Sequence, residues 1–140
     1  MNDDPAKARI LLIEDNPADV FLVKEALRTH GIDFELNWLS DGEEAVGHLA
    51  TLLTCNAAPQ LILLDLNLPK VDGKEVLSRI RSNPNLAGTK VAILTSSDSA
   101  HDRRDTASLG ANCYIKKPPT LDEFLRVGGT IKELLAAGSI

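Results

Sequence analysis

Five short apolar runs alternate along the chain with longer segments whose apolar residues recur at helical spacing. The runs lie at residues 8–15, 33–40, 61–66, 89–95 and 112–119. The longer segments lie at residues 16–31, 41–53, 72–84, 96–111 and 120–138. Short apolar runs between turn signals are typical of strands, and apolar spacings of three and four residues are typical of amphipathic helices. The pattern therefore predicts five strand–helix units in succession.

Strict alternation of strand and helix is typical of right-handed crossovers, which build a parallel sheet covered by helices on both faces. We therefore expect an α/β fold: a five-stranded, doubly wound, flavodoxin-like (βα)5 domain with strand order 2-1-3-4-5. The oily run "LILLDL" (residues 61–66) is expected at the centre of the sheet. Residues 33–40 alternate apolar and polar side chains, which predicts a half-exposed edge strand. One domain is expected over residues 1–140.

Local signals mark the ends of the first predicted helix. Asn16 suits the N-cap, Pro17 suits the first helical position, and Gly31 suits the stop. The helix at residues 96–111 carries few apolar anchors, so we expect it to be weakly packed and easily rearranged. The core candidates of the last helix are Leu121, Phe124, Leu125, Ile131, Leu134 and Leu135.

Composition narrows the class of protein. The 140 residues carry a net charge of −5, which argues against a nucleic-acid partner, since such surfaces are normally basic. The N-terminal "MNDDPAKAR" lacks the pattern of a signal peptide, and no apolar run approaches membrane-spanning length. We expect a cytoplasmic protein without membrane contacts. Cys55 and Cys113 lack metal-ligand spacing and are interpreted as free thiols, and the three histidines as surface residues.

Polar side chains stand at the ends of four predicted strands. In open parallel sheets, binding sites form at the carboxyl ends of the strands, where the strand order reverses. Carboxylates that converge there repel one another, and Mg²⁺ relieves the repulsion with carboxylate and water ligands. A lysine and a hydroxyl beside the metal then form a pocket that fits a phosphoryl group. The residues in question are Glu14 and Asp15, Asp65, Thr95, and the pair Lys116 and Lys117.

Taken in order, these strand ends resemble the receiver domain of two-component response regulators. The resemblance rests on "IED", "LLDLNLP…DG", "ILTSS" and "YIKKPP", and it extends from about Arg9 to the last helix. The stretches "EDNPADVFLVKEAL" and "LTSSD" look most like the single-domain regulators, including those paired with bacterial phytochromes. The stretch "TLLTCNAAPQ" looks longer than in the shortest receivers, and we expect it to affect the choice of partner.

The resemblance implies a role for each site residue. Asp65 would accept a phosphoryl group as an aspartyl-phosphate. Thr95 would bond that group, and Lys117, rather than its neighbour Lys116, would supply a positive charge. Tyr114 would act with Thr95 as a switch that responds to phosphorylation. The Mg²⁺ ligands would be Glu14, Asp15, Asp65 and the backbone carbonyl of Asn67.

The resemblance also implies two structural details and a set of partners. The Lys117–Pro118 peptide is expected to be cis. Because Leu66 follows Asp65, no tryptophan is expected beside the site. The partner would be a sensor histidine kinase, such as a bacterial phytochrome, or a phosphotransfer protein. The signal would leave through the face of the fourth helix, fifth strand and fifth helix, by a homodimer across this face or by a monomer that docks a partner there. The chain would not be an enzyme beyond its own phosphotransfer and autodephosphorylation.

Other interpretations stay open at this point. Taken singly, Asp15 and Thr95 suit helix caps, Asp65 suits the start of a turn, and Lys117 suits a solvated surface. A haloacid-dehalogenase-type phosphatase also uses a strand-end Asp and Mg²⁺, but Asn67 stands where its second acid would be. A flavodoxin-like mononucleotide-binding protein is the third candidate, although "EDNPAD" would repel a phosphate in the absence of a metal.

Overall fold

Five parallel strands form one sheet in the computed structural model, which describes residues 7–52 and 58–137. The strands are paired in the order β2-β1-β3-β4-β5, which confirms the predicted order and the central place of β3. Each pairing is parallel, so every strand ends at the same edge of the sheet. The strands are β1 (Ala8–Ile13), β2 (Phe34–Leu39), β3 (Leu61–Leu64), β4 (Lys90–Thr95) and β5 (Cys113–Lys116).

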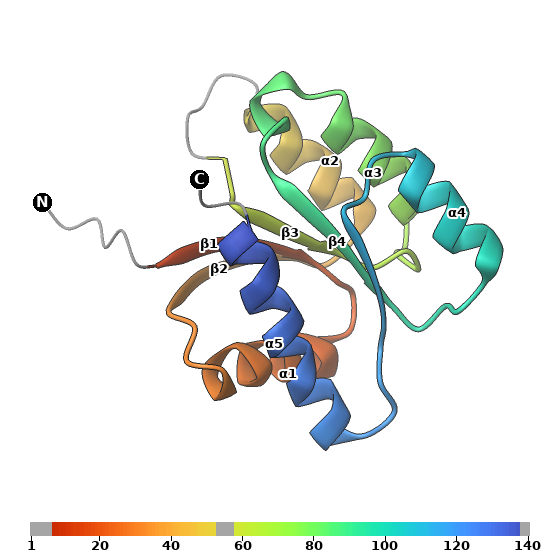
Figure 1. Ribbon diagram of the computed structural model, residues 1–140. Coiled ribbons are helices and arrows are strands. Elements are labelled where there is room, and N and C mark those ends of the chain that lie inside the picture. Colours follow the sequence, from red (N-terminus) through yellow and green to blue (C-terminus); the bar gives the residue numbers. More distant parts are fainter. Residues whose placement is uncertain (1–6, 53–57, 138–140) are drawn as a thin grey trace, which may run out of the picture.

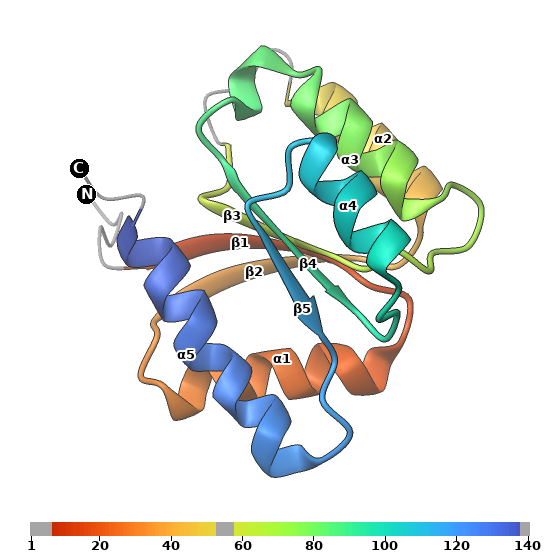
Figure 2. The same cartoon turned by 45° about the vertical axis from the view of Figure 1, so that its right-hand side comes forward.

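Helices cover both faces of the sheet (Figure 1). Helices α1 and α5 lie side by side on one face, and α2, α3 and α4 lie on the other, as the turned view in Figure 2 also shows. Each face has its own buried apolar cluster, because the strands are buried from both sides. The helices are α1 (Pro17–Thr29), α2 (Gly42–Thr51), α3 (Gly73–Arg81), the 3₁₀ turn η1 (Pro84–Leu86), α4 (Ala100–Ser108) and α5 (Leu121–Ala137).

The predicted ends of α1 are confirmed. Asn16 is the N-cap, and its side-chain oxygen accepts a hydrogen bond of 2.9 Å from the Ala18 N–H. Pro17 is the first helical residue, where its missing N–H costs nothing. Gly31 has φ of +68° and ends the helix in the left-handed region. This capped start fixes the chain that leaves β1, and with it the residues that follow the strand.

In helices α1 and α5 and at their ends, the burial of two residues differs from the prediction. Leu121 is 57% exposed, because it begins α5 before the helix meets the core at Phe124. His30 is half-buried rather than on the surface, and its Nε2 lies 3.1 Å from the carbonyl oxygen of Leu125. A Cβ at Gly128 would lie 2.2 Å from the Ala26 carbonyl oxygen, so glycine permits the close approach of the two helices.

The structure also bears on the expected Lys117–Pro118 peptide, the cysteines and membrane-spanning helices. The Lys117–Pro118 prediction was wrong, since none of the described peptide bonds is cis. The trans form is the more stable isomer of an X–Pro bond, and Lys117 reaches the strand-end pocket with it. Cys113 is a free, half-buried thiol, while Cys55 lies outside the described residues. Within residues 7–52 and 58–137, no helix has the length and apolar character needed to cross a membrane.

Candidate functional site

Four buried or half-buried polar side chains meet at the carboxyl edge of the sheet. Glu14 follows β1, Asp65 follows β3, Thr95 ends β4 and Lys117 comes directly after β5. Glu14 is 1% exposed, Asp65 is 4% exposed and Thr95 is fully buried. A buried carboxylate is costly unless it is paired, so the partners of these groups define the site.

Lys117 is the common partner of the carboxylates. Its Nζ lies 2.7 Å from Glu14 Oε1, 2.8 Å from Asp19 Oδ2 and 2.8 Å from Asp65 Oδ2. An ammonium group has three N–H donors, so each donor has one carboxylate. The Lys117 backbone N–H also donates to the Thr95 carbonyl oxygen at 2.7 Å, which fixes the start of the loop after β5.

Burial and charge shift the ionisation of this group of side chains. Burial raises the pKa of Glu14 to about 7, and the neighbouring Asp65 charge adds to the rise, while the hydrogen bond from Lys117 opposes it. Burial alone would lower the pKa of Lys117, but its hydrogen bonds to Asp19, Asp65 and Glu14 raise it above the ordinary lysine value. The pocket therefore holds a firmly protonated ammonium beside a carboxyl that ionises near neutrality.

Glu14, Asp15 and Asp65 form an acidic cluster with the composition of a metal site. Each offers a carboxylate oxygen, and these oxygens lie within 4.8 Å of one another. Asp15 is exposed, which leaves room for the waters that Mg²⁺ retains. The Asn67 N–H donates to Asp65 Oδ1 at 3.1 Å, so Asn67 lies beside the cluster. Oxygen donors, net negative charge and a solvent-facing side fit a hard divalent cation.

Ser97 links the two candidate switch residues. Its N–H donates a long hydrogen bond of 3.4 Å to Thr95 Oγ1, and its carbonyl accepts one of 2.8 Å from the Tyr114 hydroxyl. Its own hydroxyl donates to Asp102 Oδ2 in α4. The Arg103 guanidinium lies 4.5 Å from the centre of the Tyr114 ring. A change at Thr95 is thus two hydrogen bonds away from both Tyr114 and α4.

The weak packing predicted for α4 is confirmed. Within this fully described helix, Thr106 alone is buried. Ion pairs supply much of its attachment: Lys74 Nζ on α3 lies 2.7 Å from Asp102 Oδ1 and 2.9 Å from Asp105 Oδ2. Such partly exposed pairs stabilise less than apolar burial does. Helix α4 is therefore the element of this face that is easiest to displace.

The structure adds two residues that the sequence did not predict for the site. Asp19, in the first turn of α1, contacts Lys117, although an acid there has an ordinary explanation in the helix dipole. Trp38 Nε1 donates to the Glu14 carbonyl oxygen at 2.6 Å, so the expectation of no tryptophan beside the site was wrong. The tryptophan arrives from the edge strand β2 rather than from the residue after Asp65. Lys116 is outside the pocket, 3.9 Å from Asp98 on the surface.

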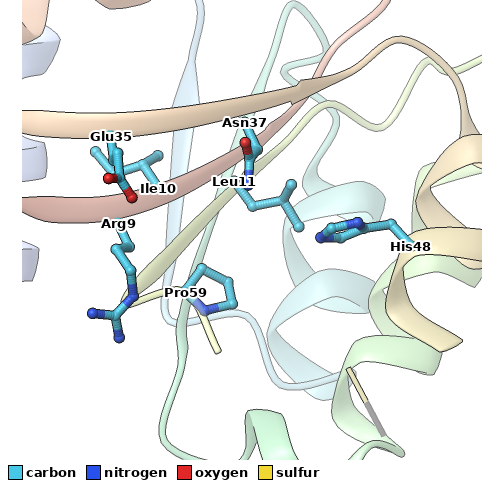
Figure 3. Close-up of a pocket in the computed structure, with 7 residues that line it drawn as sticks. All are labelled: Arg9, Ile10, Leu11, Glu35, Asn37, His48 and Pro59. Carbon is cyan, nitrogen blue, oxygen red and sulfur yellow. The ribbon is translucent and has the colours of Figure 1, made fainter. Parts of the chain in front are cut away.

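A separate hollow lies beside the beginning of β1 and is unrelated to this site. Figure 3 shows the Arg9 guanidinium next to Pro59, and the His48 ring directed toward Leu11. Arg9 there donates to the Ala58 carbonyl oxygen at 3.0 Å. None of the residues that line this hollow belongs to the strand-end pocket.

A doubly wound domain with an acidic cluster and a lysine at its strand ends fits the phosphoryl-binding pocket expected from the sequence. Residues 10–127 match the family model described as the response regulator receiver domain. The chain belongs to this family and is a receiver-domain response regulator. The match gives no support to the phosphatase or to the mononucleotide-binding alternative.

Two known proteins show which members of the family this chain is similar to. It is 43% identical to the response regulator Rcp1 of Synechocystis sp. over 84% of this chain and 82% of that protein. The crystal structure of the phosphorylated cyanobacterial phytochrome response regulator RcpA has a TM-score of 0.84 and 38% identity, and covers 96% of this chain and 98% of its own. The crystal structure of the Mn²⁺-bound form of Rcp1 has a TM-score of 0.76 and 40% identity. The match covers 90% of this chain and 92% of that chain. The chain is thus similar over most of its length to two response regulators, one of which is described as a phytochrome response regulator.

Proposed function

We propose that Asp65 is the residue of this response regulator that receives the phosphoryl group. A carboxylate oxygen of Asp65 would attack phosphorus, the bond between phosphorus and the donor's histidine nitrogen would break, and the electron pair would remain on the imidazole. The observation that carries the proposal is the 2.8 Å contact between Lys117 Nζ and Asp65 Oδ2 beside the acidic cluster. The pair holds a positive charge beside the carboxylate that would gain the phosphoryl group.

Mg²⁺ is the cation that we propose for the acidic cluster. Its ligands would be carboxylate oxygens of Glu14, Asp15 and Asp65 and the carbonyl oxygen of Asn67. When bound, the ion supplies positive charge to the phosphoryl oxygens. Support comes from the donor chemistry of the cluster and from the Mn²⁺-bound form of the similar protein Rcp1. Lys117, which follows β5, would neutralise further negative charge of the phosphoryl group. The buried Thr95 hydroxyl would donate a hydrogen bond to that group.

The switch would run through Thr95, Ser97 and Tyr114. A phosphoryl group carries about −1.5 to −2 charges at pH 7 and draws hydrogen-bond donors toward it. If the Thr95 hydroxyl turns toward that charge, its bond with the Ser97 N–H is lost, and Tyr114 and α4 are released from their present positions. The signal would then leave through the face of α4, β5 and α5.

The donor would be a sensor histidine kinase, and a bacterial phytochrome is the kind that the relatives favour. RcpA is described as a phytochrome response regulator, which supports this choice. Two large apolar side chains are exposed close along the chain to pocket residues: Phe21, two residues after Asp19, is 59% exposed, and Leu121, four residues after Lys117, is 57% exposed. Large exposed apolar side chains are suited to docking a protein. A phosphotransfer protein is the second candidate donor.

We expect the protein to be located in the cytoplasm and to catalyse reactions only at its own phosphorylation site. Its chemistry would be limited to its own phosphotransfer and autodephosphorylation, so it would not turn over a separate substrate. One domain over residues 1–140 is sufficient for this role.

Phosphorylation by acetyl phosphate and Mg²⁺ tests the proposed acceptor. Intact-mass spectrometry should show one added phosphoryl group in the wild type, labile in base, and none in Asp65→Asn. Asp72→Asn is the matched control, because Asp72 is an exposed N-cap of α3 close along the chain, and it should be phosphorylated like the wild type. A phosphoryl group retained by Asp65→Asn contradicts the proposal. Transfer from a panel of purified kinases that includes phytochromes then identifies the donor.

A homodimer across the α4–β5–α5 face is the form of output that we propose. Helix α4 carries charges of both signs, and a two-fold interface can pair such a surface with itself. Arg104 is exposed on this helix. Sedimentation with and without beryllofluoride, a phosphoryl mimic, should show a change in association. Arg104→Glu should weaken the dimer, and the difference should shrink at high salt. A protein that stays monomeric at every concentration and phosphorylation state contradicts the dimer.

A further inference from the structure

Asp19 differs from the other two carboxylates that contact Lys117. Glu14 and Asp65 belong to the acidic cluster whose oxygens lie within 4.8 Å of one another, whereas Asp19 does not. Asp19 comes from the first turn of α1, and its Oδ2 lies 2.8 Å from Lys117 Nζ. Its side chain is 19% exposed and that of Lys117 is 12% exposed, so solvent screens the pair only partly.

This difference determines which contacts Lys117 would keep when a cation and a phosphoryl group are bound. A cation in the acidic cluster would bind carboxylate oxygens of Glu14 and Asp65, which both contact Lys117 here, and a phosphoryl group would be carried by Asp65 itself. Asp19 is not part of the acidic cluster, so its carboxylate would stay available to the ammonium. The three N–H donors of Lys117 are then shared between Asp19 and the phosphoryl oxygens.

We propose that Asp19 is a positioning residue that competes with the phosphoryl group for Lys117 and so lowers the affinity of the pocket for that group. The proposal rests on the proposed function of Asp65. The competition follows from charge: the carboxylate holds the ammonium toward α1 and offsets part of the positive charge that the phosphoryl group would otherwise receive. Removal of that charge, with the shape of the side chain kept, leaves Lys117 to the phosphoryl group alone.

The affinity for beryllofluoride at saturating Mg²⁺, measured by calorimetry, tests the proposal. Asp19→Asn should bind the mimic about three- to fivefold more tightly than the wild type, which is the range of a partly exposed ion pair. Asp19→Glu restores the charge and should return the affinity toward the wild-type value. Asp122→Asn is the matched control, because Asp122 is an exposed acid in the first turn of α5, five residues after Lys117, and it should leave the affinity unchanged.

A second background separates action through Lys117 from direct repulsion. In Lys117→Gln, the Asp19→Asn substitution should have no further effect on the affinity. An effect that persists there, or an Asp19→Asn affinity equal to or below the wild-type value, overturns the proposal. Asp19→Ser gives the same comparison if Asp19→Asn fails to fold, since both remove the charge. A wild type that binds no beryllofluoride and accepts no phosphoryl group refutes the proposed function instead, so the two failures are distinguishable.

Discussion

Lys74 of α3 and Asp102 of α4 form an ion pair with 2.7 Å between Nζ and Oδ1. The same ammonium lies 2.9 Å from Asp105 Oδ2, so one lysine binds two turns of α4. Hydrogen bonds from Lys74 and Ser97 hold the pKa of Asp102 below its usual value, and that from Lys74 does the same for Asp105. With little apolar burial on α4, this lysine is the principal polar attachment of the helix to its neighbour.

Lys74→Met should therefore loosen α4 without unfolding the protein. Amide hydrogen exchange measured by mass spectrometry should become faster in residues 100–108, while the melting temperature changes little, because the pair is partly screened by solvent. Arg79→Gln is the control: Arg79 lies on the same helix and pairs with Glu75 on the exposed side. Unchanged exchange in α4 would show that other contacts hold the helix.

Gly73→Ala should damage the acceptor loop. A Cβ at Gly73 would lie 2.5 Å from the Asp65 carbonyl oxygen and 2.6 Å from the Leu66 Cα, both backbone atoms that cannot move without the strand end. We expect a loss of about 1–3 kcal/mol in the free energy of unfolding, the range for overpacking, together with slower phosphorylation. Urea denaturation and intact-mass kinetics measure the two effects.

Gly47→Ala is the matched control for that substitution. Gly47 lies in α2, and a Cβ there meets nothing within 4 Å. Alanine should stabilise the helix by about 0.5–1 kcal/mol, because it removes freedom from the unfolded chain. Equal effects of the two substitutions would contradict the close approach of Gly73 to the loop.

The metal-free protein should lose stability as the pH rises toward neutrality. The pKa of Glu14 is raised from 4.5 to about 7, chiefly by burial. A carboxyl with a higher pKa in the folded state takes up a proton on folding, so the free energy of unfolding falls between about pH 4.5 and 7. Asp41, Asp98, Asp102 and Asp105 have lowered pKa values, so their contributions are lost only in more acidic solution.

Urea denaturation in the presence of a chelator, at pH 5 and at pH 7.5, measures this dependence. Glu14→Gln cannot ionise and should flatten the difference between the two pH values. Mg²⁺ should also reduce it in the wild type, because the cation favours the ionised carboxylate. A protein that is more stable at pH 7.5 than at pH 5 without metal would contradict the role given to Glu14.

Trp38 should report metal binding by fluorescence. It is the sole tryptophan of the chain, and its indole N–H donates to the carbonyl oxygen of Glu14 at 2.6 Å. A cation at the Glu14 carboxylate changes the field at the ring, so the emission should change with Mg²⁺ and saturate at the calorimetric midpoint. Trp38→Phe should remove the signal and still bind the ion. An emission that is constant through saturation would contradict the prediction.

Much of the fold follows from the sequence because a parallel sheet leaves a simple pattern. Strands buried on both faces read as continuous apolar runs, and β3 "LILL" is the clearest of them. Once the strand order is given, chain order alone brings Glu14, Asp65 and Lys117 to one edge. Their convergence could therefore be predicted without any side-chain geometry.

The missed features depend on geometry that a linear pattern does not contain. An acid at position 19 reads as a favourable charge in the first turn of a helix, and only the path of Lys117 shows its second role. Trp38 contacts Glu14 across the β1–β2 pair, which depends on side-chain direction. Leu121 fits the helical spacing of the core, but spacing does not tell where a helix first meets the sheet.

Ser97 bonds through its N–H, its carbonyl and its hydroxyl to three different parts of the molecule. The Tyr114 hydroxyl and the start of α4 are thus hydrogen-bonded to the same residue, Ser97. In the proposed switch, a partner that contacts the Tyr114 ring and a partner that contacts α4 would therefore respond to the same change at Ser97. Substitutions on the outer surface of α4 would then change which partner binds, while the response at Ser97 to phosphorylation stays the same.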